Sequence, residues 1–244
     1  MRRFIVLMIA IGMLVPMASG CIGGGDDEST TTTPQATSPT VTTPAATLPA
    51  TTSAPSSTWE LYQFDVGDSY TYSIGWQAPE LSITGTFSLD FLPSSSKDYK
   101  VHFYGTYAGT MTGNFDTIFE SDEDEFYQSF SQSVYSSNAM ISPIFLFTVV
   151  SPWWGPYFEG RELYLGNSWS ISVEGNTSAF DIVDTCSHAG LTGYLGRWTF
   201  STSDSVVVFE TCMNSDVALP LSTDYRFNGS TPTAFTSELI SYST

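Results

Sequence analysis

The stretch Leu-Ser-Ile-Thr-Gly-Thr-Phe-Ser-Leu-Asp-Phe at residues 81–91 alternates apolar and polar side chains. Every second position carries a large apolar residue, except that Gly85 leaves one of these positions without a side chain. A period of two places the apolar side chains on one face of a β-strand and the hydroxyl and carboxyl groups on the other. The stretch therefore predicts a strand with one face buried in a core.

The same pattern recurs along the chain, between clusters of Gly, Asn, Asp, Ser and Pro. Further strands are predicted near residues 99–103, 111–115, 169–173, 194–200, 206–213 and 235–242. Turn clusters at this spacing are typical of an antiparallel meander. An aromatic content of 15% favours a well-filled, β-rich core.

One central segment, residues 121–154, breaks the strand pattern. Ser121 is expected to cap a helix whose acidic first turn spans residues 122–125, where negative charge is favoured by the helix dipole. The helix would bury one apolar stripe, made of Phe126, Phe130 and Val134. A second, short helix is expected between Pro143 and Pro152, because proline suits the start of a helix and ends one that reaches it.

Residues 59–244 are thus expected to form a single domain, with four strands before the helical insert and five or six after it. The predicted fold class is α+β, mainly a curved antiparallel β-sheet with a central helical insert. An all-β sandwich is the alternative.

The N-terminus resembles an export signal followed by a lipidation site. Two arginines at positions 2 and 3 precede the apolar residues 4–15, a run too short to span a bilayer but typical of a signal peptide. Small residues then precede Cys21, as in a lipobox, although Ala18 stands where leucine is usual. We expect residues 1–20 to be a signal peptide and the Cys21 thiol to carry a lipid. An ordinary secretory signal and an uncleaved anchor are the alternatives.

A tether follows at residues 21–58. From residue 29 onward it is almost wholly Ser, Thr, Pro and Ala, a composition with too little apolar surface to fold and suited to O-glycosylation. Together with the lipobox, this tether resembles the start of archaeal surface lipoproteins. The resemblance implies a membrane partner through the lipid, and a domain held on the outer face of the cytoplasmic membrane.

Charge and composition exclude several classes of function. The chain has 7 Lys and Arg against 25 Asp and Glu, a net charge of −18. Nucleic acid is therefore not expected as a partner, because phosphate binding needs clustered basic residues. With 2 His and 3 Cys, neither a metal site nor a cofactor is expected.

Two cysteines remain in the predicted domain, Cys186 and Cys212. Outside the cell we expect them to form a disulfide, with free thiols or a metal site as alternatives. Asn176 and Asn228 begin sequences that fit the N-glycosylation acceptor pattern, so both are expected in exposed turns.

No catalytic residue is predicted. Gly67-Asp68-Ser69 invites comparison with the Gly-Asp-Ser lipases and esterases, but Asp184 and His188 are four residues apart rather than three. Residues 66–71 also resemble residues 165–170, which indicates one turn used twice, with glycine at positive φ. His102 is expected on an exposed strand face and His188 in a loop. The acidic residues 120–125 lack the spacing of a calcium loop, so a solvated helix start is expected.

The apolar end of the insert suggests two functions. A sheet closed over a central helix resembles, in architecture alone, the lipoprotein-carrier half-barrels of the LolA and LppX kind. That resemblance implies a cleft for a hydrophobic ligand, for which the candidate lining is Phe145, Phe147, Trp153 and Trp154. The favoured hypothesis is a non-catalytic binding module for a glycan or a surface protein, with the insert as core. A hydrolase is a less favoured alternative.

Overall fold

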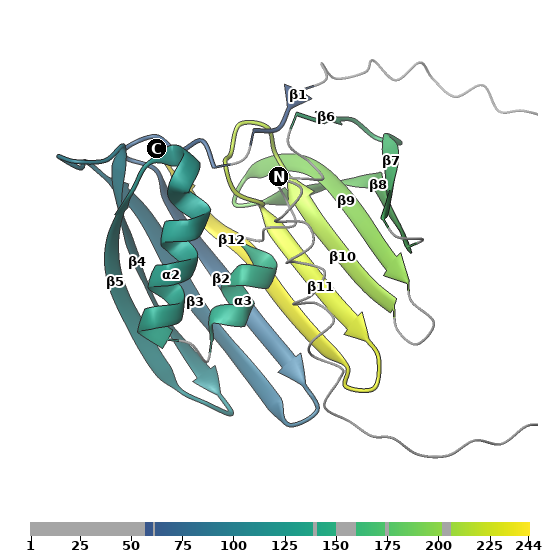
Figure 1. Cartoon of the computed structure of the whole chain (residues 1–244), viewed down its shortest axis with the longest axis horizontal. Helices are drawn as coiled ribbons and strands as arrows, with labels where there is room; N and C mark the ends of the chain where they lie inside the picture. The colour runs from purple at the N-terminus through teal and green to yellow at the C-terminus, as the bar shows by residue number, and fades with distance from the viewer. Residues whose placement is uncertain (1–56, 61, 139–140, 150–159, 174–175, 202–205) are drawn as a thin grey trace, which may run out of the picture. The chain divides into compact units, whose positions relative to one another are not determined.

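The computed structural model describes residues 57–60, 62–138, 141–149, 160–173, 176–201 and 206–244. Ten antiparallel strands form one sheet, in the order β5-β4-β3-β2-β12-β11-β10-β9-β8-β7 (Figure 1). Their bounds are Ser69–Ala78 (β2), Leu81–Leu92 (β3), Tyr99–Gly109 (β4), Gly113–Ser121 (β5), Ser168–Val173 (β7), Asn176–His188 (β8), Leu191–Ser201 (β9), Val206–Met213 (β10), Ser222–Asn228 (β11) and Thr233–Ser243 (β12). Two short strands, β1 (Ser57–Thr58) and β6 (Glu162–Leu163), pair separately.

The chain path explains why the helical insert crosses the inner face of the sheet. Strands β2 to β5 proceed from the middle of the sheet to one edge, and β7 to β12 return from the other edge until β12 pairs with β2. The segment between β5 and β7 therefore has to cross from one edge to the other. It contains a short 3₁₀ turn, η1 (Glu123–Glu125), and the helices α2 (Phe126–Asn138) and α3 (Ser142–Thr148).

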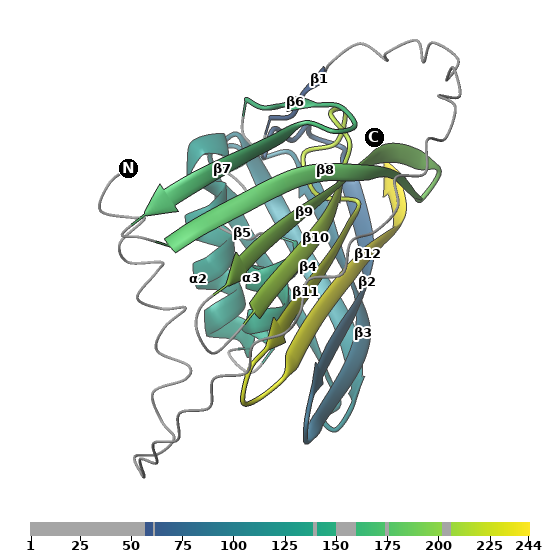
Figure 2. The ribbon, with the colours of Figure 1, turned by 90° about the vertical axis from the view of Figure 1, so that its right-hand side faces the viewer.

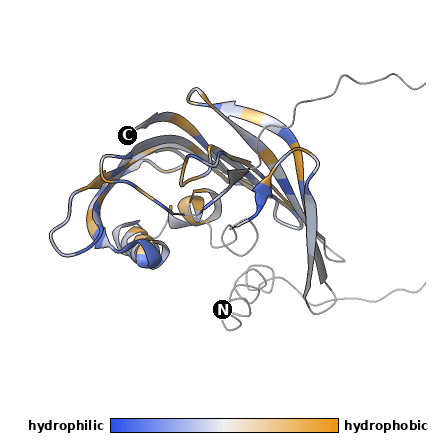
Figure 3. Ribbon diagram, turned by 90° about the horizontal axis from the view of Figure 1, so that it is seen from above, coloured by the Kyte–Doolittle hydropathy of each residue, from blue (hydrophilic) through white to orange (hydrophobic). Residues whose placement is uncertain are grey.

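The mainly β, antiparallel fold predicted from the alternating pattern is confirmed. Four strands of the large sheet precede the helices and six follow them. All ten belong to one sheet, so the described residues do not divide into the two facing sheets of a sandwich. Seen from above, the sheet curves around α2 and α3 (Figure 3).

The inner face of the sheet, turned toward the helices, holds the main core. The stripe predicted on α2, made of Phe126, Phe130 and Val134, is buried against it. Gly85 allows the neighbouring strand to approach closely, because a Cβ atom there would lie 2.3 Å from the carbonyl oxygen of Thr106. A second apolar cluster lies toward the other edge, around Phe180 and Phe209.

The repeated motif forms the same turn at the start of β2 and of β7, as predicted. Gly67 and Gly166 have φ angles of 114° and 86°. The amide of Gly67 donates to the carbonyl of Phe91 over 2.8 Å, and that of Gly166 donates to Ile182 over 2.9 Å. Each turn therefore anchors the first strand of a meander to the second, by one hydrogen-bond scheme used twice.

Candidate functional site

The residues predicted to line an apolar cleft are described only in part. Phe145 in α3 is fully buried, and its ring centroid lies 5.0, 4.9 and 5.4 Å from those of Phe87, Phe103 and Phe115. Edge-to-face contacts at these distances are those of a packed aromatic core. The side chain of Phe147 lies outside the described residues, as do Trp153 and Trp154.

The outer face of the sheet, turned away from the helices, is rich in hydroxyl groups. On β12, Phe235 and Leu239 are buried in the core, while Thr236 and Glu238 alternate with them and are exposed. The strand register places Ser73, Ser222 and Cys212 in one row with Glu238. Hydroxyls and carboxylates thus face outward on neighbouring strands, because directly opposed residues share a face.

A groove of about 270 Å³ lies on this outer face. Its lining comes from strands β2 and β8 to β12 and is mostly polar, including Ser73, His188, Glu210, Ser222, Asp224 and Glu238. Among the lining residues Leu195 alone has an apolar side chain. The groove was not predicted from the sequence, because its residues are brought together only by the pairing of distant strands.

The far end of β8 forms one side of the groove. A bulge between Ile182 and Asp184 interrupts the pairing of β8 with β9, and β7 and β8 turn away from the direction of the neighbouring strands (Figure 2). Nδ1 of His188 then lies 3.1 Å from Oε1 of Glu238 on β12. His188 therefore ends a strand, so its predicted position in a loop is wrong.

The predicted disulfide between Cys186 and Cys212 is confirmed, with Cα atoms 6.0 Å apart. It joins β8 to β10, two strands that do not neighbour each other in the sheet. The bridge therefore holds the end of β8 beside the groove, next to the contact of His188 with Glu238.

The carboxylates of the groove have basic partners. Glu210 and Asp224 are directly opposite on β10 and β11, a pairing of like charges that is unfavourable by itself. Nε of Arg197 donates to Glu210 over 2.7 Å, and Nε of Arg226 donates to Asp224 over 2.9 Å. Two guanidinium groups thus offset the repulsion, and the neighbouring Asp224 raises the pKa of Arg226.

The Gly-Asp-Ser segment is a turn with a polar network, and its serine does not meet a histidine. The Ser69 hydroxyl donates to Asp90 over 2.6 Å, and Asp90 is opposite His102 in the strand register. Nε2 of His102 lies 2.9 Å from Asp116. A nucleophilic serine needs the imidazole next to its hydroxyl, with the carboxylate behind the imidazole. Here the carboxylate stands between them.

The acidic residue of this turn is buried. Asp68 is 4% exposed, and its Oδ2 accepts hydrogen bonds from the amide of Asp65 over 3.1 Å and the hydroxyl of Tyr70 over 3.2 Å. Desolvation by burial raises the pKa of the Asp68 carboxyl despite these two donors. In the second turn the equivalent residue is the neutral Asn167, whose side chain donates to the carbonyl of Glu162 over 2.7 Å.

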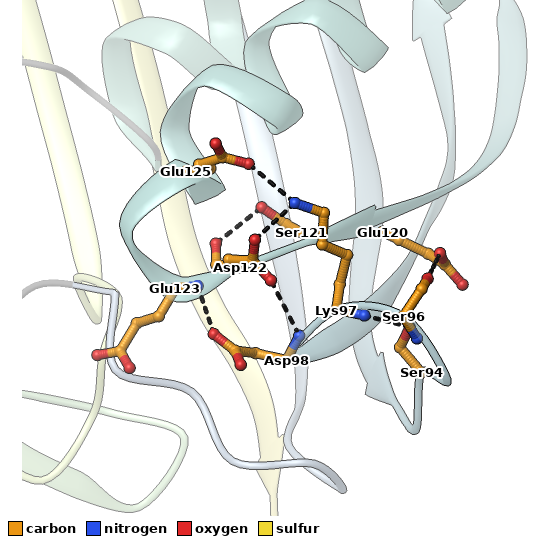
Figure 4. Close-up of polar contacts among 9 residues, drawn as sticks. All are labelled: Ser94, Ser96, Lys97, Asp98, Glu120, Ser121, Asp122, Glu123 and Glu125. Carbon is orange, nitrogen blue, oxygen red and sulfur yellow. Dashed lines mark hydrogen bonds and ion pairs between the residues drawn. The ribbon is translucent and has the colours of Figure 1, made fainter.

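The acidic segment before α2 is held by a lysine (Figure 4). Nζ of Lys97 lies 2.5 Å from Asp122 and 3.2 Å from Glu125, so an ammonium group occupies the space between the carboxylates. The predicted cap at Ser121 is wrong, because Ser121 still pairs with Tyr99 in the sheet and its hydroxyl donates to the carbonyl of Asp122. The cap comes instead from Asp98, which accepts from the amide of Glu123 over 3.0 Å.

Two further predictions concern exposure. His102 lies on the outer face of β4 with 28% of its side chain exposed, in agreement with the alternation of its strand. Asn228 is exposed at the end of β11, while the side chain of Asn176, the first residue of β8, lies outside the described residues. Glycosylation at either asparagine stays a prediction.

Comparison with protein-family models, curated proteins and solved structures found no match. Among the residues that the structure describes, no group of three His, Cys, Asp or Glu side chains is arranged to hold a metal ion. In the same part of the chain, no helix is long and apolar enough to cross a membrane.

Proposed function

We propose that this chain is a lipid-anchored, non-catalytic binding module on the outer face of the cytoplasmic membrane. Cys21 carries the lipid, residues 21–58 form the tether, and residues 59–244 form one α+β domain with a curved sheet around a helical insert. The sequence pattern of residues 1–58 supports the anchor and the tether.

The burial of Phe145 is the observation that favours a binding module over a carrier of hydrophobic ligands, because it makes the insert part of the core. Its ring packs among Phe87, Phe103 and Phe115, so the described part of α3 packs against the inner face of the sheet as core. The groove and the hydroxyl-rich outer face then remain as the surface for recognition. The hydrogen bond from Ser69 to Asp90 further supports a non-catalytic role for the Gly-Asp-Ser turn.

A titration with a fluorescent long-chain fatty acid tests this function against the carrier alternative. A packed inner face predicts no saturable increase of fluorescence when the full chain is added to the probe. Heat-denatured chain serves as the control for non-specific adsorption. Saturable uptake by the folded chain at one site per molecule would contradict the proposal and favour a carrier.

A further inference from the structure

The groove on the outer face is formed before any ligand arrives. Its side at β8 is fixed to β10 by the Cys186–Cys212 disulfide and to β12 by the contact between His188 and Glu238. A covalent bridge and a polar contact, two residues apart on this strand end, keep it close to the sheet. Binding here would therefore require little ordering of the chain, and this lowers the entropic cost of association.

The charged side chains of the groove are paired with one another, although the whole chain has a net charge of −18. Glu210 and Asp224 have guanidinium partners, and Glu238 has an imidazole partner. A free cation would have to compete with these groups, while an anion would meet three carboxylates. The pairing therefore disfavours a small ion of either sign as the ligand.

Capacity for hydrogen bonding nevertheless remains. A carboxylate offers about four acceptor positions and a guanidinium five donors, more than the ion pairs use. Within the described part of the chain, no protein group pairs with the side-chain hydroxyls of Ser73, Ser222 and Thr236. The groove thus presents donors and acceptors close together, in an arrangement suited to a ligand with several hydroxyl groups.

The size and polarity of the groove restrict the class of ligand further. A volume of about 270 Å³ lies below the lower end, about 300 Å³, of pockets that hold drug-sized molecules. With Leu195 as its only apolar lining side chain, the groove offers little surface to an acyl chain. These properties fit one sugar unit of a longer chain.

We propose that this groove binds a neutral glycan, with one sugar unit seated on the hydroxyls of β2, β11 and β12 and between the paired carboxylates. The inference rests on the proposed binding function and names its ligand class. Glu210, Asp224 and Glu238 accept hydrogen bonds from sugar hydroxyls, and Arg197 and Arg226 hold the first two carboxylates in place. Because few apolar contacts are available, the dissociation constant for one site is expected to be about 1 mM. Multivalent display of the chain or of the glycan would strengthen the overall binding through avidity.

The test uses the full chain on an array of neutral and acidic oligosaccharides, followed by calorimetric titration with the best neutral oligosaccharide. Thr236→Trp fills the groove from an exposed position on β12 and is expected to abolish binding. The matched control is Thr106→Trp, exposed on the same face and in the same row as Glu238 but three strands away. Ser222→Ala should weaken binding about three- to tenfold by removing one hydroxyl.

Neutral-glycan binding that survives Thr106→Trp and is lost in Thr236→Trp supports the assignment. Three results overturn it: no neutral oligosaccharide bound by the parent, binding retained in Thr236→Trp, or binding confined to acidic glycans. None of these results bears on fatty-acid uptake, so a failure of the glycan assignment is distinguishable from a failure of the proposed function.

Discussion

At the scale of single residues, the two copies of the repeated turn differ in charge. Asp68 is a buried carboxyl whose pKa is raised by burial, whereas its counterpart Asn167 is neutral. A raised pKa means that the folded chain binds this proton more tightly than the unfolded chain does. The contribution of Asp68 to stability therefore falls as pH rises from about 3.9, the value in an unfolded chain, through the folded-state pKa.

Asp68→Asn should remove this loss of stability at higher pH. Asparagine keeps an oxygen that can accept from the amide of Asp65 and the hydroxyl of Tyr70, but it has no charge to desolvate. Urea unfolding between about pH 3 and about pH 7 should show the variant gaining stability over the parent as pH rises. Glu80→Gln, at an exposed turn residue, is the control and should follow the parent. Parallel curves for Asp68→Asn and the parent would count against this account.

Phe145 is the residue on which the interpretation of the insert depends. Truncation of a buried phenylalanine removes apolar contacts and leaves a cavity, so Phe145→Ala should lower the free energy of unfolding by about 3–5 kcal/mol. Tyr135→Ala, at a side chain on α2 that is 66% exposed, should change it by less than about 0.5 kcal/mol. Thermal or urea unfolding measures both. A Phe145→Ala variant as stable as the parent would show that the ring borders an existing space.

At the scale of elements, the disulfide joins the end of β8 to β10, two strands that are separated in the sheet by β9. It closes a loop with a sequence separation of 26 residues, for which the chain-entropy model gives about 3.5 kcal/mol of stabilisation. The double variant Cys186→Ala and Cys212→Ala should lose about this much in urea unfolding. A reducing agent should destabilise the parent and leave the double variant unchanged.

The bridge also predicts a chemical result. Alkylation of the folded, unreduced chain should label neither Cys186 nor Cys212, and both should react after reduction and unfolding. Peptide mass spectrometry locates the label. Modification of both thiols before reduction would contradict the disulfide.

The elements themselves could largely be predicted from the sequence. Alternation near Phe87 and Leu89 marks strands with one buried face, and the stripe on α2 marks a helix, because burial of one face imposes these periods on the sequence. The cap at Ser121 could not be judged in the same way, since the group that caps the helix, Asp98, comes from a different turn. Short-range patterns in the sequence do not indicate contacts with residues from a distant turn.

The candidate site was beyond prediction for the same reason. The alternation of apolar and polar residues indicates that Glu210, Asp224 and Glu238 lie on the outer face of their strands. It does not indicate which strands are neighbours in the sheet. The meeting of His188 with Glu238 depends on a bulge in β8 and on the return of β12 to the middle of the sheet. The disulfide was predictable because few cysteines leave few pairings.

At the scale of the whole molecule, the first prediction concerns the anchor. If the lipid on Cys21 is the main attachment, Cys21→Ser should release the chain from membranes or leave the precursor unprocessed. Fractionation of host cells into membrane and soluble parts, followed by immunoblotting, measures this. Cys186→Ala is the matched control, because it removes a cysteine from the domain and should leave the chain in the membrane fraction. Processed Cys21→Ser chain that stays fully in the membrane fraction would contradict lipid anchoring.

The proposed function requires that the inner face of the sheet is a packed core and that the molecule is a tethered binding module. The most direct measurement is a native mass spectrum of the chain purified from its own host. We expect the mass of a chain beginning at Cys21, with a covalent lipid, an intact disulfide and any glycans, and with no lipid held non-covalently. A stoichiometric non-covalent lipid or fatty acid that dissociates on collisional activation would contradict the account and show that the domain is a carrier.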